Sequence, residues 1–375
     1  MHTDSYQQLI NMRPDTQDYL SVLLSDTPLL DVRAPVEFAQ GAFPNVINLP
    51  LMNDDERHRV GLQYKQKGQD AAIELGHELV AGDIKQSRIA KWVEFAKANP
   101  QGYLYCFRGG LRSRISQQWL AEAGIQYPRI VGGYKAMRSF LLESLELNIA
   151  SSSFVLVAGF TGSGKTVVMK ELTAAIDLEK LAHHRGSSFG KHATDQPVQI
   201  DFDNRLAIEL LRLNTKGVTK IALEDESRLI GKCALPISMR DKMLASPVVW
   251  VEEPTESRVE RILHDYVEDL GAQFKTLLGE EAGFEAFSIR LLESLKNLYK
   301  RLGGERHTRL ENSMQHALDT QKMTGKIEAH RDWIRPLLME YYDPMYEHQR
   351  EGKASRIIFS GDQKAVTQYL KESGY

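Results

Sequence analysis

The chain contains little cysteine, no long apolar run and almost no net charge. Its 375 residues include two cysteines, Cys106 and Cys233, too few to stabilise a secreted scaffold of this length by disulfides. No segment approaches the roughly 18 consecutive apolar residues that a membrane-spanning helix needs. The opening MHTDSYQQLINMRPD lacks the basic and apolar regions of a secretion signal. These absences favour a cytoplasmic protein without a membrane segment.

The charge balance excludes a strongly basic module. The formal net charge is -3, and each half of the chain carries almost as many basic as acidic side chains. Bulk electrostatics therefore neither attracts nor excludes nucleic acid, so any RNA contact must come from local basic groups. A hydrophobic content of 42% is ordinary for a folded protein, and the length suits two domains of about 100–200 residues each.

Short apolar strands alternate with helical stretches in the first part of the chain. Strands are expected at 28–32, 46–49, 103–107 and 129–131, and helices at 87–98 and 113–123. This alternation predicts an α/β fold. The second of these helices is expected to start at a Ser113 cap and to end at Gly124.

A second α/β unit begins near residue 153. There the apolar strand 154–158 runs into a glycine-rich loop and a helix from Lys165. Further strands are expected at 199–202, 220–223 and 247–251, followed by a mainly helical C-terminal region. We therefore predict two domains, at 13–142 and 152–375, the second built on a parallel sheet.

Cys106 stands at the end of a predicted strand, in a glycine-containing loop just before a helix N-terminus. Loop N–H groups and neighbouring arginines in such a place stabilise a thiolate and hold an anionic donor beside it. Cys106 is therefore the predicted nucleophile. The predicted anion-binding residues of its loop are Arg108, Gly109, Gly110, Arg112, Ser113 and Arg114.

The Cys106 segment and an upstream turn, Asp31-Val32-Arg33 with Glu37, together resemble the rhodanese superfamily. The resemblance covers about residues 13–140 and includes Val131-Gly132-Gly133-Tyr134. It implies an N-terminal rhodanese-like domain for chalcogen transfer. We interpret Asp31, Arg33 and Glu37 as structural, because buried ion pairs commonly fix such turns.

The loop between Cys106 and Arg112 is one residue longer than in most simple sulfurtransferases, since five residues separate the two. A wider loop admits a wider anion. One interpretation is a cysteine phosphatase with the rhodanese fold, in which Cys106 accepts a phosphoryl group. The other is a phosphate-bearing chalcogen donor such as selenophosphate, with Cys106 attacking its selenium or sulfur.

The segment 159–166, Gly-Phe-Thr-Gly-Ser-Gly-Lys-Thr, matches the full P-loop pattern between a strand and a helix. Backbone N–H groups of such a loop bind a di- or triphosphate, Lys165 neutralises outer phosphate oxygens, and the Thr166 hydroxyl can ligate Mg²⁺. The predicted phosphate-binding residues are Gly159, Gly162, Ser163, Gly164, Lys165 and Thr166.

Carboxylates at the ends of later predicted strands could hold Mg²⁺ or its waters. They are Asp201, Asp203, Glu224 and Asp225. No permanently bound cofactor or metal is expected, and His183-His184 is interpreted as a surface pair because no third ligand stands at zinc-site spacing.

The segment 184–190, His-Arg-Gly-Ser-Ser-Phe-Gly, combines a basic group, two hydroxyls and an aromatic ring in a predicted exposed loop. Such loops suit contacts to an RNA backbone, and the ring could stack on a base. The predicted tRNA contacts are Arg185, Ser187, Ser188 and Phe189.

A rhodanese-like module joined to a P-loop module resembles the bacterial tRNA 2-selenouridine synthase family. The resemblance is strongest in two segments, Cys-Phe-Arg-Gly-Gly-Leu-Arg-Ser and His-Arg-Gly-Ser-Ser-Phe-Gly. The segments 224–228, 302–306 and 341–346 also look like that family's, and Phe107 stands where some relatives have Trp. The resemblance implies a transferase that converts 2-thiouridine at the tRNA wobble position to 2-selenouridine through an S-geranyl intermediate.

In that interpretation geranyl diphosphate and selenophosphate are substrates, and the partners are the tRNA and the enzyme that produces selenophosphate. The P-loop would hold the prenyl diphosphate, and Cys106 would carry selenium as a perselenide. Three alternatives stay open. They are a P-loop kinase or ATPase with a regulatory rhodanese module, the cysteine phosphatase, and a sulfur-relay or RNA-binding adaptor.

Overall fold

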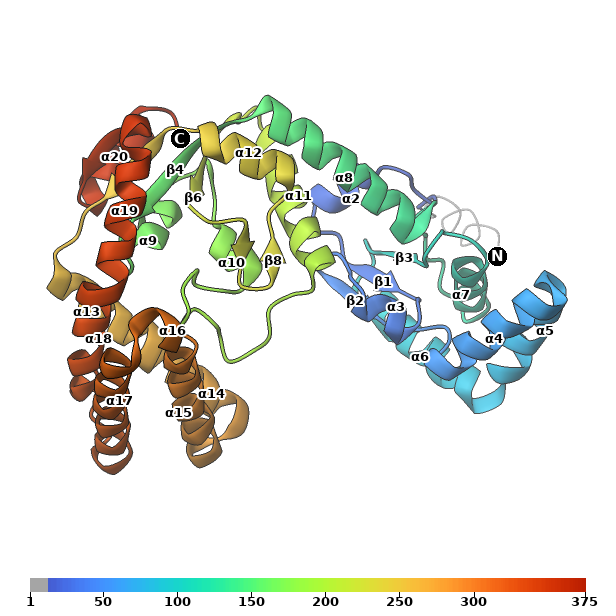
Figure 1. Cartoon of the computed structure of the whole chain (residues 1–375). Coiled ribbons are helices and arrows are strands. Elements are labelled where there is room, and N and C mark those ends of the chain that lie inside the picture. The colour runs from blue at the N-terminus through green and yellow to red at the C-terminus, as the bar shows by residue number, and fades with distance from the viewer. Residues whose placement is uncertain (1–12) are drawn as a thin grey trace. The chain divides into compact units, whose positions relative to one another are not determined.

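Apolar runs bounded by turn residues form two separate parallel sheets in the computed structural model, which describes residues 13–375 (Figure 1). The chain divides into two units. The first, here called the cysteine unit, contains the described residues up to 147 together with 203–212, and the second, the P-loop unit, contains 148–202 and 213–375. Each unit is described by itself.

The cysteine unit is built on a three-stranded parallel sheet in the order β2-β1-β3. Its strands are β1 (Leu29–Asp31), β2 (Val46–Asn48) and β3 (Tyr103–Tyr105). Its helices are α2 (Tyr19–Leu24), α3 (Pro35–Ala39), α4 (Asp54–Lys67), α5 (Gln69–Leu79), α6 (Gly82–Ala98), α7 (Leu111–Glu122) and α8 (Gly133–Ser151), the last ending just beyond the unit. Leu30, Leu104 and Trp92 are fully buried in its core.

The strand predicted at 129–131 is reduced to isolated bridges. Arg129 pairs with Leu104, and Ile130 pairs with Thr16. The segment is too short to continue a ladder because helix α8 begins at Gly133, so the prediction of a full strand there is wrong.

The P-loop unit is built on a five-stranded parallel sheet in the order β10-β9-β4-β6-β5. Its strands are β4 (Ser153–Gly159), β5 (Ala175–Ile176), β6 (Lys220–Glu224), β9 (Val248–Val251) and β10 (Ile357–Gly361), with a separate antiparallel pair β7 (Leu229–Ile230) and β8 (Cys233–Ala234). The central strand β4 is exposed only at Ser153 and buried from Phe154 to Gly159, as expected for a parallel strand covered on both faces.

Helices form most of the rest of the chain. They are α9 (Lys165–Lys170), α10 (Leu178–Ala182), α11 (Gln199–Thr215), α12 (Ile237–Ala245), α13 (Thr255–Leu263), α14 (Leu270–Leu278), α15 (Glu280–Lys296), α16 (Tyr299–Leu302), α17 (Gly304–Thr324), α18 (Arg331–Leu337), α19 (Asp343–Lys353) and α20 (Gln363–Glu372). Residues 203–212 of α11 belong to the cysteine unit. Short 3₁₀ turns are η2 (Glu328–His330) and η4 (Ala354–Arg356), and π-helical turns are η1 (His264–Asp269) and η3 (Leu338–Tyr342). No helix within residues 13–375 has the length and apolar character needed to cross a membrane.

The strand predicted at 199–202 is wrong, because this segment is the first turn of helix α11. Phe202, Leu206 and Leu210 recur every four residues and are fully buried, which is the signature of one helix face. The four-residue window was too short to separate that period from a strand. Asp201 and Asp203 therefore lie on a helix and not at the end of a strand.

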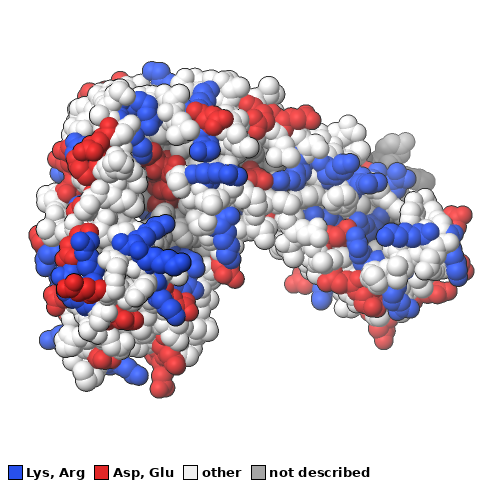
Figure 2. Space-filling view, in the orientation of Figure 1, with Lys and Arg blue, Asp and Glu red and all other residues white. Residues whose placement is uncertain are grey.

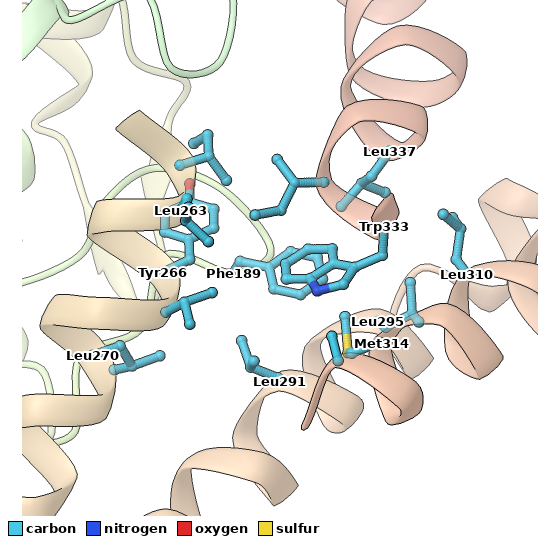
Figure 3. Close-up of a cluster of buried hydrophobic side chains, with 14 of the residues drawn as sticks. Phe189, Leu263, Tyr266, Leu270, Leu291, Leu295, Leu310, Met314, Trp333 and Leu337 are labelled. Carbon is cyan, nitrogen blue, oxygen red and sulfur yellow. The ribbon is translucent and has the colours of Figure 1, made fainter. Parts of the chain in front are cut away.

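The helical region has a hydrophobic core of its own, in which Phe189, Tyr266 and Trp333 lie together (Figure 3). Phe189 comes from the loop after α10, Tyr266 from η1 and Trp333 from α18. This core fixes the loop 184–190, which otherwise has no regular structure of its own.

Candidate functional site

Cys106 directly follows strand β3 and precedes helix α7, as predicted. Its residue is 3% exposed, and its thiol lies 3.3 Å from the Ser113 hydroxyl, to which it donates. Ser113 in turn donates to the Gly110 carbonyl at 3.0 Å. The helix begins at Leu111, so Ser113 is not the cap but a first-turn residue whose hydroxyl faces the sulfur. By rotating, that hydroxyl can donate to a thiolate instead.

The Cys106 loop is shaped by the segment that precedes α8. Gly109 has φ +62°, and a Cβ there would lie 2.6 Å from the Gly132 nitrogen, so only glycine fits. The Arg129 guanidinium donates to the Gly109 carbonyl at 2.6 Å, and the Tyr134 N–H donates to the Cys106 carbonyl at 3.0 Å. These contacts fix the backbone conformation of the loop without a ligand.

The three arginines of this loop differ in what they contact. Arg112 forms an ion pair with Glu37 at 2.5 Å, while Arg108 and Arg114 are exposed and make no ion pair within residues 13–375. Burial raises the pKa of Glu37, but the hydrogen bond and charge of Arg112 outweigh it and leave the pKa below its usual value. Because Arg112 is already paired, the two exposed arginines are the available anion-binding groups.

The P-loop follows β4 and has the backbone conformation that its glycines predict. Gly162 and Gly164 both have φ +81°. The N–H groups of Thr161, Gly162 and Gly164 have no backbone acceptor within residues 13–375. The hydroxyls of Thr161 and Ser163 are also buried without a hydrogen-bond partner in this part of the chain. These free donors suit a phosphate chain.

Side chains from distant helices bind the P-loop carbonyls. The guanidinium of Arg258 donates to the Thr161 carbonyl at 2.9 Å, and that of Arg261 to the Gly162 carbonyl at 2.5 Å. From α20, the Gln363 amide donates to the Ser163 carbonyl at 3.0 Å. Sequence reasoning missed all three residues, because they stand about 95 to 200 positions from their partners and belong to no motif.

Lys165 faces three carboxyl groups, those of Glu179, Glu224 and Glu226. Burial lowers the pKa of Lys165, but these carboxyl groups and Tyr346 outweigh it and raise the pKa above its ordinary value. Glu224 accepts from the Thr166 hydroxyl at 3.4 Å and from the Glu179 N–H at 2.9 Å. Burial raises the pKa of Glu179 and of Glu224 well above the usual range. Glu179 carried no sequence signal, since it stands on a short helix outside the motif.

The four predicted magnesium carboxylates do not come together. Glu224 lies beside Thr166, as expected, and Asp225 pairs with Lys353. Asp203 lies on α11 and pairs with Arg138 at 3.0 Å, and Asp201 lies on the same helix, so neither stands at the end of a strand. Within residues 13–375 no group of three His, Cys, Asp or Glu side chains is arranged to hold a metal ion.

The loop 184–190 is packed against the helical region, and the prediction that Phe189 stacks on a base is wrong for this structure. Phe189 is 1% exposed, with ring centroids 6.0 Å from Tyr266 and 5.6 Å from Trp333 (Figure 3). Arg185 pairs with Asp269, and the Ser187 hydroxyl lies 2.7 Å from that of Tyr266. Ser188 remains partly exposed.

The histidine pair 183–184 is not a surface pair. His184 is buried, and burial lowers its pKa to about 4. The His183 ring contacts the Thr194 hydroxyl at 2.7 Å. Both rings therefore serve the local packing of this loop. Cys233 is also buried.

Charged side chains of both signs cover the surface. Figure 2 shows several Lys and Arg side chains gathered on the visible face of the P-loop unit, with acidic side chains around them. This distribution agrees with the small net charge and with local, not global, attraction for a polyanion.

Fold and site together define a class: a P-loop protein with a second α/β unit that presents a cysteine in a loop before a helix. Comparison with known families narrows this class. The family model described as the tRNA 2-selenouridine synthase AAA domain matches residues 152–374.

Three curated relatives, each named tRNA 2-selenouridine synthase, match nearly the whole chain. That of Azotobacter vinelandii is 60% identical and covers 96% of this chain and 98% of its own. Those of Pseudomonas syringae pv. syringae and Bordetella bronchiseptica are 58% identical, covering 96% and 97% of this chain and 99% of their own. The chain belongs to the tRNA 2-selenouridine synthase family, and it is a transferase-type enzyme that modifies tRNA.

Proposed function

We propose that the enzyme converts 2-thiouridine at the tRNA wobble position to 2-selenouridine in two steps. Geranyl diphosphate first alkylates the sulfur, and selenium from selenophosphate then replaces the geranylthiol. The observation that carries the first step is the P-loop, whose N–H groups lack acceptors and whose lysine faces inward among carboxyl groups. Such a loop stabilises the diphosphate leaving group in the transition state.

Cys106 acts in the second step. Support comes from the thiol-to-hydroxyl contact with Ser113 and from the two unpaired arginines, Arg108 and Arg114, which suit an anionic donor. Selenium enters at C2, and the geranylthiolate leaves with the electron pair of the C–S bond. Selenium has the same oxidation state in selenophosphate and in the product, so this exchange needs no oxidant.

The phosphorus product reports what Cys106 carries. Attack of the thiolate on selenium gives a perselenide and leaves phosphorus as phosphite, because the P–Se electron pair stays on phosphorus. The perselenide then displaces geranylthiolate from C2, and an external thiol must reduce the S–Se bond by attacking the Cys106 sulfur, which leaves selenium on the base and a disulfide on Cys106. Release of phosphate shows instead that the P–Se bond breaks with its electrons on selenium, without a cysteine perselenide. Phosphorus NMR of the reaction mixture distinguishes the two.

Arg112 provides an observation against the phosphatase alternative. A cysteine phosphatase needs the loop arginine for its substrate phosphate, whereas Arg112 here is already bound by Glu37. The kinase or ATPase alternative shares the P-loop, so it is tested by activity. Hydrolysis of ATP stimulated by tRNA, without prenyl transfer, would support it.

The experiment is nucleoside mass spectrometry of a 2-thiouridine-containing tRNA after incubation with geranyl diphosphate. We expect the wild-type protein to form the geranylated base and Lys165→Ala to lose at least about 100-fold in rate, since removing one preorganised charge contact costs about that factor. Lys170→Ala, at the exposed end of the same helix, is the matched control. An unmodified base with folded wild-type protein would contradict the proposal.

A further inference from the structure

Geranyl diphosphate carries an apolar chain of two isoprene units, bound through oxygen to its diphosphate group. Removing such a chain from water favours binding in proportion to the apolar surface that is buried. The chain starts at the diphosphate. If the P-loop holds the diphosphate, a site for the chain must therefore begin at the P-loop.

Three aromatic rings meet at the start of the P-loop. Phe160 is the second residue of the loop, and its ring centroid lies 5.6 Å from that of Trp250 on β9 and 6.4 Å from that of Tyr346 on α19. The sheet register pairs Trp250 with Ala158, two residues before Phe160, so these side chains leave their strands on the same face. Trp250 is buried, whereas Phe160 and Tyr346 are partly exposed.

Two arginines hold these rings in place. The Arg258 guanidinium lies 5.0 Å from the Phe160 ring centroid and also pairs with Asp343. The Arg350 guanidinium lies 5.3 Å from the Trp250 ring centroid. Contacts between a guanidinium and an aromatic face are attractive, so they restrain the rings without a ligand. A site that is already ordered loses less entropy when it binds.

Helix α19 is tied to the carboxyl ends of three neighbouring strands. Its side chains at three- and four-residue spacing share one helix face and contact the residues that directly follow β4, β9 and β6. These contacts are Tyr346 with Phe160, Arg350 with Glu252, and Lys353 with Asp225. Every residue of α19 is at least partly exposed, so the helix offers the Tyr346 ring beside the P-loop without sealing it into a core.

The ring geometry favours a chain over a nucleobase. The Phe160 ring plane lies at 86° to that of Trp250 and at 72° to that of Tyr346. Proteins bind a flat base by stacking it on aromatic faces. Rings that meet edge to face instead present an angled apolar surface, which a flexible isoprenoid chain can follow and a flat base between two rings cannot.

We propose that the aromatic cluster of Phe160, Trp250 and Tyr346 binds the prenyl chain of geranyl diphosphate. The inference rests on the proposed function, which supplies this ligand. Phe160 and Tyr346 offer the ring surfaces that the chain contacts, and Trp250 supports Phe160 from the buried side. The P-loop N–H groups without backbone acceptors within residues 13–375 begin at the next residue, Thr161, so one ligand reaches both.

The test measures binding by calorimetry in the absence of tRNA, with geranyl diphosphate and with inorganic diphosphate, which has no chain. We expect Tyr346→Ala to weaken the affinity for geranyl diphosphate about tenfold, because an apolar contact is lost, and to keep the affinity for inorganic diphosphate within about twofold. Tyr346→Phe retains the ring and should bind both ligands as wild type does. His348→Ala removes an exposed ring from the same helix and should also leave both affinities unchanged.

A second measurement needs no substitution, which covers the case in which Tyr346→Ala does not fold. Wild-type protein should bind dimethylallyl diphosphate, which has one isoprene unit instead of two, about tenfold more weakly than geranyl diphosphate. Equal affinities for these two esters would overturn the inference, because the second isoprene unit would then have no binding site.

Three results with Tyr346→Ala would also overturn it. They are an unchanged affinity for geranyl diphosphate in the folded variant, an equal loss for geranyl diphosphate and inorganic diphosphate, and a loss of ATP binding in a protein whose wild type prefers ATP. Failure of the proposed function is a separate result. If geranyl diphosphate binds as predicted but wild type forms no geranylated base on a 2-thiouridine tRNA, the proposed function fails and the chain site stands.

Discussion

At the scale of single residues, the Ser113 hydroxyl is placed to stabilise a Cys106 thiolate. Its position 3.3 Å from the sulfur lets it donate to the thiolate after losing its bond to Gly110. We predict that Ser113→Ala slows alkylation of Cys106 by iodoacetamide at neutral pH about 10-fold or more, because a hydrogen bond to a charged acceptor contributes about 1.5–3 kcal/mol. Peptide mass spectrometry distinguishes Cys106 from Cys233.

The control for this prediction is Ser116→Ala on the same helix. Ser116 is also buried, but its hydroxyl donates to the Arg112 carbonyl at 3.0 Å and not toward the sulfur. Equal alkylation rates in the two variants would show that the Ser113 contact does not stabilise the thiolate.

Phe189 is a core residue, and its substitution should act on stability. Removing a buried Phe side chain typically costs about 3–5 kcal/mol. We predict that Phe189→Ala lowers the free energy of unfolding by that amount, measured by chemical denaturation, whereas Ser188→Ala in the same loop leaves it unchanged. A loss of tRNA binding with unchanged stability in Phe189→Ala would restore the base-stacking interpretation.

Residues in local motifs were predictable, and residues placed by long-range packing were not. The Cys106 loop and the P-loop are each defined by strand, glycines and helix start within about ten residues, so sequence alone locates them. Phe189 looked exposed because its neighbours are polar and glycine-rich. Its burial depends on Tyr266 and Trp333, which no local pattern connects to it.

At the scale of elements, α13 and α20 hold the P-loop open for phosphate. Arg261 and Gln363 bind successive carbonyls, which keeps the neighbouring N–H groups available. We predict that Arg261→Met weakens binding of geranyl diphosphate about tenfold, or ~1.4 kcal/mol, measured by calorimetry. Arg331→Met, which removes an exposed ion pair with Glu260, should leave the affinity unchanged. Equal affinity in both variants would contradict this role.

At the segment 199–202 the sequence predicts a strand, but the structure has the first turn of a helix. Two aspartates flanking Phe202 suggested a strand end with metal-binding carboxylates. The buried spacing of Phe202, Leu206 and Leu210 continues over about two turns and requires a helix. The prediction that Asp201 and Asp203 follow a strand and hold magnesium is wrong for the same reason. Glu224 does lie beside Thr166, because the strand that it ends, β6, was predicted correctly.

At the scale of the whole molecule, the proposed function assigns each of its two steps to a different unit. Geranyl diphosphate should therefore protect the P-loop unit from hydrogen exchange and leave the Cys106 loop unchanged. A ligand at about 100 times its Kd stabilises the site it binds by about 2.7 kcal/mol. We predict slower exchange in peptides covering 153–170 and unchanged exchange in peptides covering 103–122, measured by mass spectrometry. Protection confined to 103–122 would place the prenyl donor at the cysteine.

The most direct test of the proposal that the P-loop unit carries out geranylation and the cysteine unit selenation uses the variant Cys106→Ala. The measurement is mass spectrometry of the nucleosides of a 2-thiouridine tRNA. The folded variant is incubated with geranyl diphosphate and then with selenophosphate, and the bases are separated by mass spectrometry. The account predicts that the geranylated base forms at the wild-type rate and that no 2-selenouridine follows. Loss of both products, or formation of 2-selenouridine without Cys106, would contradict it.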